Sequence, residues 1–265
     1  MIEYCSLASG SCGNSHYIKT DHFNILVDVG MTAKYIKDAL KQIGESMDEI
    51  DAVFITHEHS DHIKGLAVLA KHYEFSIYLH RSIYAYLEHQ LAHIPLERFC
   101  FIDEGRLVLQ NLAIDIFSVS HDATNTFGFT FEQGEKKIGI VTDIGHISDQ
   151  ARHHLSDCDF LVLESNHDEH LVEVGRYPYV LKQRILSRNG HLSNRSAGEF
   201  IAEIYLEKRR LKYCVLAHLS QENNYPELAY MSVENILANH SILIGRDLMV
   251  SVALRRQISD RFRIV

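Results

Sequence analysis

Residues 57–62 read His57-Glu58-His59-Ser60-Asp61-His62 and directly follow an apolar run at residues 52–56. This H-x-H-x-D-H pattern brings four potential metal ligands within six residues, at the end of a segment typical of a buried strand. Imidazoles and carboxylates are common ligands of divalent cations, and a short loop can direct several of them to one place. The pattern therefore predicts a site for one or two metal ions.

Other residues able to bind metal or to transfer protons follow apolar runs elsewhere in the chain. They are Asp28, His121, Asp143, Glu164 and His218. If the preceding strands share a face, these side chains converge on one rim, which is how a rigid scaffold builds an active site.

The spacing of apolar residues predicts a mixture of strands and helices. Extended runs occupy residues 2–8, 17–19, 24–29, 52–56, 107–109, 113–120, 127–132, 137–142 and 160–164. Apolar residues at helical spacing occupy residues 34–43, 63–73, 196–209 and 228–238. Strands and helices do not alternate strictly, so we expect mixed sheets with outer helices rather than a doubly wound parallel sheet.

The length and composition are those of a globular protein with a sizeable core, since 46% of the 265 residues are hydrophobic. With three prolines and no repeat, low-complexity tract or recognisable linker, the sequence indicates a single domain spanning residues 1–265. The five cysteines are scattered and lack C-x-x-C spacing, so we expect reduced thiols and a cytoplasmic protein. Neither an export signal nor a membrane-spanning stretch is expected.

The formal net charge is −9, from 26 basic and 35 acidic residues. This excess of acid argues against broad electrostatic attraction to nucleic acid or to an anionic membrane. It does not exclude a nuclease, because bound divalent cations would dominate the field at the site itself.

The motifs, in their order along the chain, resemble those of the metallo-β-lactamase superfamily, and the match covers nearly the whole length. They are Asp28, His57-x-His59-x-Asp61-His62, His121, Asp143 and His218. The resemblance implies an α/β fold, a four-layer αβ/βα sandwich with two mixed β-sheets and a metal site at one edge between them. It also implies two divalent metal ions per chain, and His and Asp ligands accept zinc, manganese or iron.

Carried over residue by residue, the resemblance assigns ligands to both ions. His57, His59 and His121 would bind the first ion, Asp61, His62 and His218 the second, and Asp143 would bridge them. Asp28 would bind no metal but would orient a ligand imidazole or the Asp61 loop through hydrogen bonds. An ordinary turn aspartate before Gly30 is the alternative for Asp28.

The ligand set favours hydrolysis of phosphodiesters. Lactamases of the superfamily often carry cysteine at the position of Asp143, and flavodiiron members replace the second motif histidine, here His59, with an acid. An aspartate between two cations suits a bridging hydroxide as nucleophile, with both metals stabilising oxygens of the displacement. The candidate catalytic residues are Asp61, Glu164 and His191.

Two further stretches carry candidate acid/base and substrate-binding residues. They are Glu164-Ser165-Asn166-His167-Asp168 and Gly190-His191-Leu192-Ser193-Asn194. In nucleases of the superfamily, an acidic residue and a histidine at similar positions lie beside the metals. A protonated His191 could donate to a phosphate or departing sugar oxygen while Glu164 holds its ring and raises its pKa. A plain loop histidine before a helix is the alternative for His191, and His167 is a further substrate-binding candidate because it shares a loop with Glu164.

The loop Ser9-Gly10-Ser11-Cys12-Gly13-Asn14 lies between the first two predicted strands. Its glycines permit tight turns, so backbone N–H groups and the side chains of Ser9, Ser11 and Asn14 could hold a phosphate or carboxylate of the substrate. A hairpin loop without a role in binding is the alternative.

Together with Ala217-His218-Leu219-Ser220, these stretches resemble the bacterial YycJ/WalJ subgroup, which implies 5′ to 3′ exonuclease action on DNA. The alternatives are an RNA-directed nuclease, a small-molecule hydrolase of thiolesters or cyclic phosphodiesters, and a metal-stabilised scaffold, which would not need seven aligned ligands. A basic group between the two candidate nuclease loops indicates either phosphate contact or a plain exposed helix. Its members are Arg176, Lys182, Arg184 and Arg188. No membrane partner is expected, and the sequence leaves the oligomeric state open.

Overall fold

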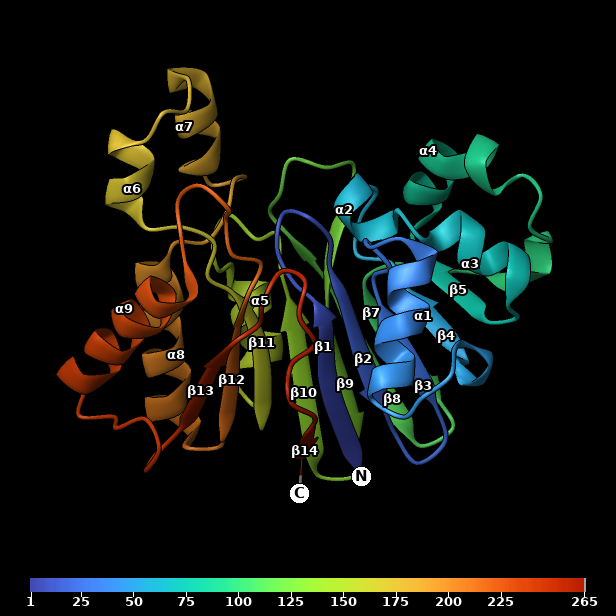
Figure 1. Ribbon diagram of the computed structural model, residues 1–265. Coiled ribbons are helices and arrows are strands. Elements are labelled where there is room, and N and C mark those ends of the chain that lie inside the picture. The colour runs from blue at the N-terminus through green and yellow to red at the C-terminus, as the bar shows by residue number, and fades with distance from the viewer. Residues whose placement is uncertain (265) are drawn as a thin grey trace. The chain divides into compact units, whose positions relative to one another are not determined.

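The computed structural model describes residues 1–264, and the contacts within it divide the chain into two compact units. The first unit comprises residues 1–104, 123–125 and the C-terminal stretch from Arg255, and the second comprises residues 105–122 and 126–254. Each unit contains one β-sheet and its own helices, which are labelled in Figure 1.

The sheet of the first unit has seven strands in the described residues, in the order β14-β1-β2-β3-β4-β5-β6. The strands are β1 Ile2–Ala8, β2 Ser15–Lys19, β3 Asn24–Val27, β4 Ala52–Phe54, β5 Ser76–Leu79, β6 Phe99–Phe101 and β14 Phe262–Ile264. Neighbours from β14 to β3 pair antiparallel, whereas β3, β4, β5 and β6 run parallel. The helices are α1 Ala33–Gln42, α2 Ser60–Ile63, α3 Leu66–His72 and α4 Arg81–Leu91, with short 3-10 helices at Met47–Glu49 and Leu96–Arg98.

The core of the first unit forms where apolar helix faces meet the sheet. In α1, Ile36, Ala39 and Leu40 are buried at helical spacing, as an amphipathic helix requires. The Thr32 hydroxyl caps this helix by accepting a hydrogen bond from the Tyr35 N–H. All seven residues of β1 are buried, including Glu3, whose carboxylate accepts from the Arg263 guanidinium.

One predicted helix is interrupted. The periodic pattern at residues 63–73 predicts a single helix, but the chain forms α2, then Lys64 and Gly65, and then α3. The Gly65 N–H donates to Val29 O at 2.8 Å, and a Cβ at Gly65 would come within 2.7 Å of Met31 O. Close approach of the chain that follows β3 therefore delays the start of α3 to Leu66.

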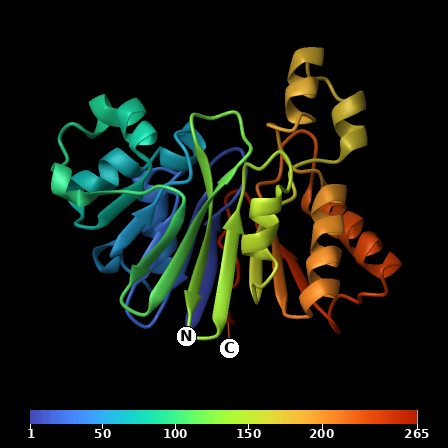
Figure 2. The same cartoon turned by 180° about the vertical axis from the view of Figure 1, so that it is seen from behind.

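The sheet of the second unit also has seven strands in the described residues, in the order β13-β12-β11-β10-β9-β8-β7. The strands are β7 Gly105–Leu109, β8 Leu112–Val119, β9 Thr126–Gln133, β10 Lys136–Val141, β11 Phe160–Glu164, β12 Tyr213–Ala217 and β13 Met249–Val252. Neighbouring strands from β7 to β10 pair antiparallel, whereas those from β10 to β13 run parallel. The antiparallel strands are green to yellow-green in Figure 2. The helices are α5 Asp149–Leu155, α6 Glu169–Val174, α7 Tyr179–Ile185, α8 Asn194–Lys208 and α9 Pro226–Asn239.

A second core joins α5, α8 and α9 to this sheet. In α8, Phe200, Ile201 and Ile204 are buried. Gly198 allows α9 to approach α8 closely, because a Cβ there would lie 2.8 Å from Ile236 Cδ1. No helix of the described residues is both long enough and apolar enough to cross a membrane.

Strand direction gathers the predicted site residues at one edge within each unit. In the first unit, Asp28 and the H-x-H-x-D-H motif follow the parallel strands β3 and β4. In the second unit, β8, β10, β11 and β12 point the same way, because β8 and β10 are both antiparallel to β9 and β10 to β12 are parallel. Their carboxyl ends are followed or formed by His121, Asp143, Glu164 and His218.

The two mixed seven-stranded sheets with accompanying helices confirm the predicted α/β class and exclude a doubly wound parallel sheet. Several short elements were not predicted from the sequence. They include β5, β6, β13 and β14, which have three or four residues each, too few to show a clear apolar alternation.

Candidate metal centre

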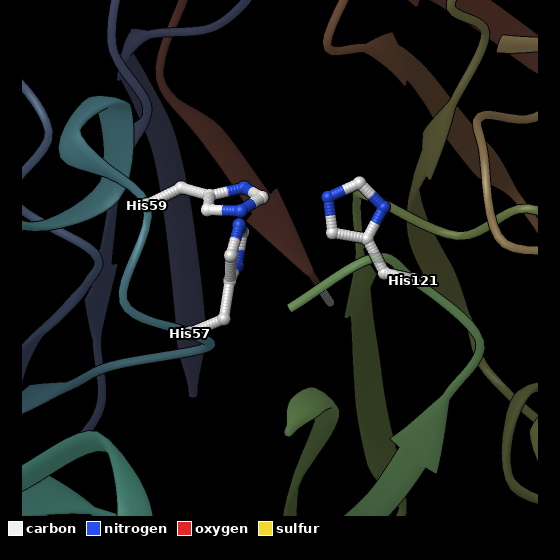
Figure 3. A group of neighbouring side chains, drawn as sticks. All are labelled: His57, His59 and His121. Carbon is white, nitrogen blue, oxygen red and sulfur yellow. The ribbon is translucent and has the colours of Figure 1, made fainter. Parts of the chain in front are cut away.

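The H-x-H-x-D-H motif begins in the loop after β4 and continues into α2, which contains Asp61 and His62; we call residues 57–62 the motif loop. His57 and His62 are fully buried, whereas His59 and Asp61 are partly exposed. The His57 ring centroid lies 4.6 Å from that of His59 and 4.1 Å from that of His62. Figure 3 shows the neighbouring imidazoles of His57 and His59 and also draws His121, which belongs to the second unit. The motif loop therefore gathers three imidazoles and one carboxylate within the first unit.

Asp28 fixes the orientation of His62. Asp28 Oδ2 accepts from His62 Nδ1 at 2.7 Å and from the Thr56 hydroxyl at 2.8 Å, and Oδ1 accepts from the Thr56 N–H at 2.9 Å. With Nδ1 donating to a carboxylate, the imidazole carries its lone pair on Nε2, the atom that a metal can bind. The structure thus gives Asp28 the contact expected of a residue that orients a ligand.

The loop at residues 9–14 braces the motif loop through Asn14. The Asn14 N–H donates to Asp61 O at 2.8 Å, and the Asn14 amide nitrogen lies 3.1 Å from His62 Nε2. Asn14 O accepts from the Gly30 N–H at 2.8 Å. A Cβ at Gly30 would come within 1.6 Å of Asp61 O, so this meeting of three chain segments requires glycine.

These contacts bear on the substrate-binding residues predicted in the same loop. Ser9 and Asn14 are fully buried, and the Gly10 N–H already donates to Asn14 Oδ1 at 2.8 Å. The Gly13 N–H donates to Gly10 O at 2.9 Å. Ser11 is therefore the exposed member of the predicted trio, and the bracing role accounts for Asn14 without a bound phosphate.

In the second unit, Glu164 connects residues for which the sequence predicts different tasks. Its Oε1 accepts from His191 Nδ1 at 2.8 Å and from His218 Nδ1 at 2.7 Å. Its Oε2 accepts from the backbone N–H groups of Ile144 at 2.8 Å and Leu192 at 3.2 Å. Burial alone would raise the pKa of Glu164, but the two imidazoles lower that pKa to about 2. Burial likewise opposes protonation of His191, yet the Glu164 carboxylate raises the pKa of His191 above its usual value.

Asp143 lies between the imidazoles of His121, which follows β8, and His218, which follows β12. Its Oδ1 is 3.5 Å from His121 Nε2 and 3.6 Å from His218 Nε2. His121 Nδ1 donates to Gly190 O at 3.1 Å, and burial lowers the pKa of His121, which favours the neutral imidazole that metals bind. A neutral imidazole that donates through Nδ1 carries its lone pair on Nε2. The Nε2 atoms of His121 and His218 both face Asp143 Oδ1, and this arrangement suits a cation bound among the three atoms.

The donor atoms of the second unit are close enough to serve one metal site. Asp143, Glu164, His191 and His218 each offer an atom within 4.8 Å of the others. Nitrogen and oxygen donors of this kind, with carboxylates hydrogen-bonded to the far side of the imidazoles, are typical of zinc and related transition metals. The chemistry of the donor set therefore fits a divalent metal ion.

Three residues that follow strands at these edges have left-handed backbone conformations. Their φ angles are 60° for Asp28, 54° for Asp143 and 54° for His218. Such conformations cost about 1–3 kcal/mol for residues other than glycine and cluster at functional sites, where the surroundings hold them. Each of the three makes the side-chain contacts described above, so the turn after the strand sets the direction of the functional group.

His167 and His191, both predicted to contact substrate, lie in different environments. His167 is only 1% exposed, its carbonyl accepts from the Asn194 N–H at 2.9 Å, and burial lowers its pKa to about 4. The His191 side chain is 23% exposed. Of the two, His191 is the one that a substrate can reach in this structure.

Sequence reasoning did not single out the polar residues that hold these loops in place. Glu58, a variable position of the motif pattern, accepts from the Thr124 N–H at 2.7 Å and from the Thr124 hydroxyl at 2.6 Å. Asn166, Asn194 and Asn224 form a buried amide cluster beside the end of β11. Asparagine in a loop normally indicates an exposed turn, so no sequence signal distinguishes these buried residues.

Comparison with known proteins adds independent findings. The model of the β-lactamase superfamily domain matches residues 23–218. Exodeoxyribonuclease YycJ of Bacillus anthracis is 36% identical over 245 residues, which are 92% of this chain and 92% of that protein. Exodeoxyribonuclease WalJ of Streptococcus pneumoniae is 38% identical over 252 residues, which are 94% of this chain and 93% of that protein.

A solved structure shows the same fold. The metallo-β-lactamase fold protein YhfI of Bacillus subtilis aligns with a TM-score of 0.70 over 98% of this chain and 100% of that chain, at 16% sequence identity. The fold is therefore of the metallo-β-lactamase type, as the sequence motifs predict. From the extent of the family match and the identity to YycJ and WalJ over nearly the whole chain, this protein belongs to the metallo-β-lactamase superfamily of metal-dependent hydrolases, in the YycJ/WalJ group.

Proposed function

We propose that this enzyme is a two-metal phosphodiesterase that degrades DNA as a 5′ to 3′ exodeoxyribonuclease. The observation that carries the proposal is the identity of 36% and 38%, over more than nine-tenths of the chain, to relatives named exodeoxyribonuclease. The position of the carboxylate Asp143 between His121 and His218 supports hydrolysis at a metal centre built from nitrogen and oxygen donors.

The proposed metal ligands are those that the sequence motifs predict. His57, His59 and His121 would hold one ion, Asp61, His62 and His218 would hold the other, and Asp143 would serve both. Asp28 supports this assignment, because its 2.7 Å hydrogen bond to His62 Nδ1 directs Nε2 to the metal. Zinc, manganese or iron would suit these ligands, because all three accept histidine and aspartate.

Divalent ions bound there would activate water and stabilise negative charge on the phosphate. The side chains of the protein then supply orientation and proton transfer. Glu164 holds the His191 ring through Nδ1 at 2.8 Å, so the Nε2 side of the ring is the side that can donate a proton to the departing sugar oxygen. Asp61, which is partly exposed beside His62, orients the water or the phosphate in addition to binding metal.

The test is a cleavage assay with metal-reconstituted protein on end-labelled single- and double-stranded DNA and RNA, with bis-p-nitrophenyl phosphate and a glutathione thiolester as small substrates. We expect stepwise release from the 5′ end of DNA. Asp143→Ala should lose at least one metal ion and nearly all hydrolysis. His191→Ala should keep its metal and lower turnover about 10²–10⁴-fold, the usual contribution of a general acid.

Asp38→Ala provides the matched control, because Asp38 is an exposed residue of α1 and should affect neither metal content nor turnover. Full activity in Asp143→Ala would refute the ligand assignment. Turnover of the small substrates alone would instead make the protein a small-molecule hydrolase, and release from RNA alone would make it a ribonuclease.

We also propose that the enzyme acts in the cytoplasm, where DNA is available and where thiols stay reduced. None of the five cysteines in the described residues forms a disulfide, and Cys5, Cys158 and Cys214 are buried, which is the state expected in a reducing compartment. Cell fractionation with an antibody against the protein tests this location.

A further inference from the structure

A helical segment of the second unit has no part in the metal centre. Residues 169–190, which we call the α6–α7 arm, contain α6 and α7 and connect the loop after β11 to His191. In Figure 1 the arm extends away from α8 and α9, at the end of the unit where β11 and β12 finish. Val172 and Ile185 are buried, so the arm has its own apolar anchors.

The outer surface of the arm combines exposed apolar groups with positive charge. Val174, Tyr179 and Val180 are 63%, 74% and 79% exposed. Several exposed apolar side chains on one short segment are typical of an interaction surface. Residues 174–190 contain four basic and no acidic side chains, and the arm as a whole, with Glu169 and Glu173, has four basic and two acidic residues, a net charge of +2, although the whole chain has a net charge of −9. The arm is thus a local basic and aromatic surface on an acidic protein.

The base of the arm is bonded to residues beside the metal centre. Gly190 O accepts from His121 Nδ1 at 3.1 Å, and Asn189 Oδ1 accepts from the Ser120 hydroxyl at 2.7 Å. Arg184 forms an ion pair with Asp122, which itself lies 3.2 Å from His121 Nε2. A ligand that follows the arm toward His191 is therefore led to the proposed metal ligand His121.

We propose that the α6–α7 arm binds the single strand of the DNA substrate. Arg176 and Arg188 contact backbone phosphates, and a base stacks on the exposed ring of Tyr179. Basic side chains interleaved with an aromatic side chain are the usual means of holding a single strand without reading its sequence. This proposal rests on the proposed function, because it names the surface that carries the substrate of that site.

The experiment measures binding to a strand that the enzyme cannot cleave. A fluorescent oligothymidylate with phosphorothioate linkages is titrated with metal-reconstituted, full-length protein at several salt concentrations. For Arg176→Gln/Arg188→Gln, we expect weaker binding and a plot of log affinity against log salt whose slope is reduced by about 1.4, since each contact to a single strand contributes about 0.7. Tyr179→Ala should weaken binding about 5- to 150-fold at fixed salt, the effect of losing one stacked base.

Lys208→Gln/Lys212→Gln is the matched control. It removes the same charge from the second unit, but Lys208 ends α8 and Lys212 precedes β12, each at the far end of its element from the metal centre. The control should keep the wild-type affinity and salt slope. Metal content and melting temperature of all variants should equal those of the wild type, which shows that the folded centre is intact.

Wild-type affinity in the arm variants, equal losses in the arm and control variants, or no binding by the wild type would each overturn the proposal. If the arm variants keep the wild-type DNA affinity but sediment differently from the wild type, the arm serves a contact between protein molecules instead. Because cleavage is not measured, the proposed exonuclease activity can fail in its own assay while binding by the arm holds, and the reverse is also possible.

Discussion

At the scale of single residues, one buried carboxylate orients two imidazoles that have different proposed tasks. Glu164 accepts from both His191 and His218, and its second oxygen is held by two backbone N–H groups. Because all four partners donate, the site requires a group that accepts at both oxygens. Glu164 therefore supports the proposed metal ligand His218 as well as the proposed proton donor His191.

We expect Glu164→Gln to weaken metal binding about 10- to 100-fold and to lower turnover, since an amide of the same shape accepts at only one of the two positions. Competition with a chelator measures the metal affinity, and DNA cleavage measures the turnover. Glu199→Gln, at an exposed position of α8 outside the arm, is the control for the same chemical change. Wild-type metal affinity in Glu164→Gln would show that the contact to His218 does not support metal binding.

At the scale of elements, a buried amide cluster joins the ends of β11 and β12 to the start of α8. Asn224 Nδ2 lies 2.9 Å from Ser165 O, 3.0 Å from Asn166 O and 2.9 Å from Asn194 Oδ1. Asn166 Nδ2 in turn donates to His218 O at 2.9 Å. Buried polar networks of this kind rigidify the segments they connect when every member is satisfied.

Asn224→Ala should destabilise the protein by about 1–3 kcal/mol, because buried carbonyl groups lose their donor. For a protein of this size, each kcal/mol lowers the melting temperature by roughly 2–4 °C, which a thermal scan of the metal-loaded protein detects. Asn239→Ala, at the exposed C-terminal end of α9, should leave the melting temperature unchanged. Equal melting temperatures for the wild type and Asn224→Ala would mean that the cluster contributes nothing to stability.

At the scale of the whole molecule, neither unit is a continuous piece of chain. The chain enters the second unit at Gly105, returns to the first at Ala123, leaves it again at Thr126 and comes back at Arg255. The last described strand, β14, pairs with β1, so the first unit needs both ends of the chain for its sheet. The first unit therefore cannot be completed before the chain of the second has been made. The single domain stays a prediction, which the unfolding of the whole protein tests.

We expect one cooperative unfolding transition in differential scanning calorimetry, with equal calorimetric and van't Hoff enthalpies, as single domains show. Saturating metal should raise the transition temperature without dividing the transition, since a ligand that binds only the folded state stabilises it. Two separate transitions, whose order or spacing changes with metal, would contradict the single-domain prediction.

The sequence by itself determined the class of the fold and most of the longer elements, and it predicts the metal site. The apolar run before His57 and the ligands within residues 57–62 are local features, so their meaning does not depend on where the rest of the chain lies. Helical spacing at residues 34–43 likewise predicts α1 within one residue at each end. Local periodicity failed where a distant segment intervened, as at Gly65.

Only the tertiary structure decided which proposed ligand each supporting carboxylate meets. Asp28 meets His62 across 34 residues, and Glu164 meets His218 across 54 residues, because parallel strands bring their carboxyl ends together. It also decided that Asn14 and His167 are buried while His191 remains accessible. A single sequence holds no local sign of these facts, since strand order, register and the left-handed turns after the strands arise from contacts between segments far apart in the chain.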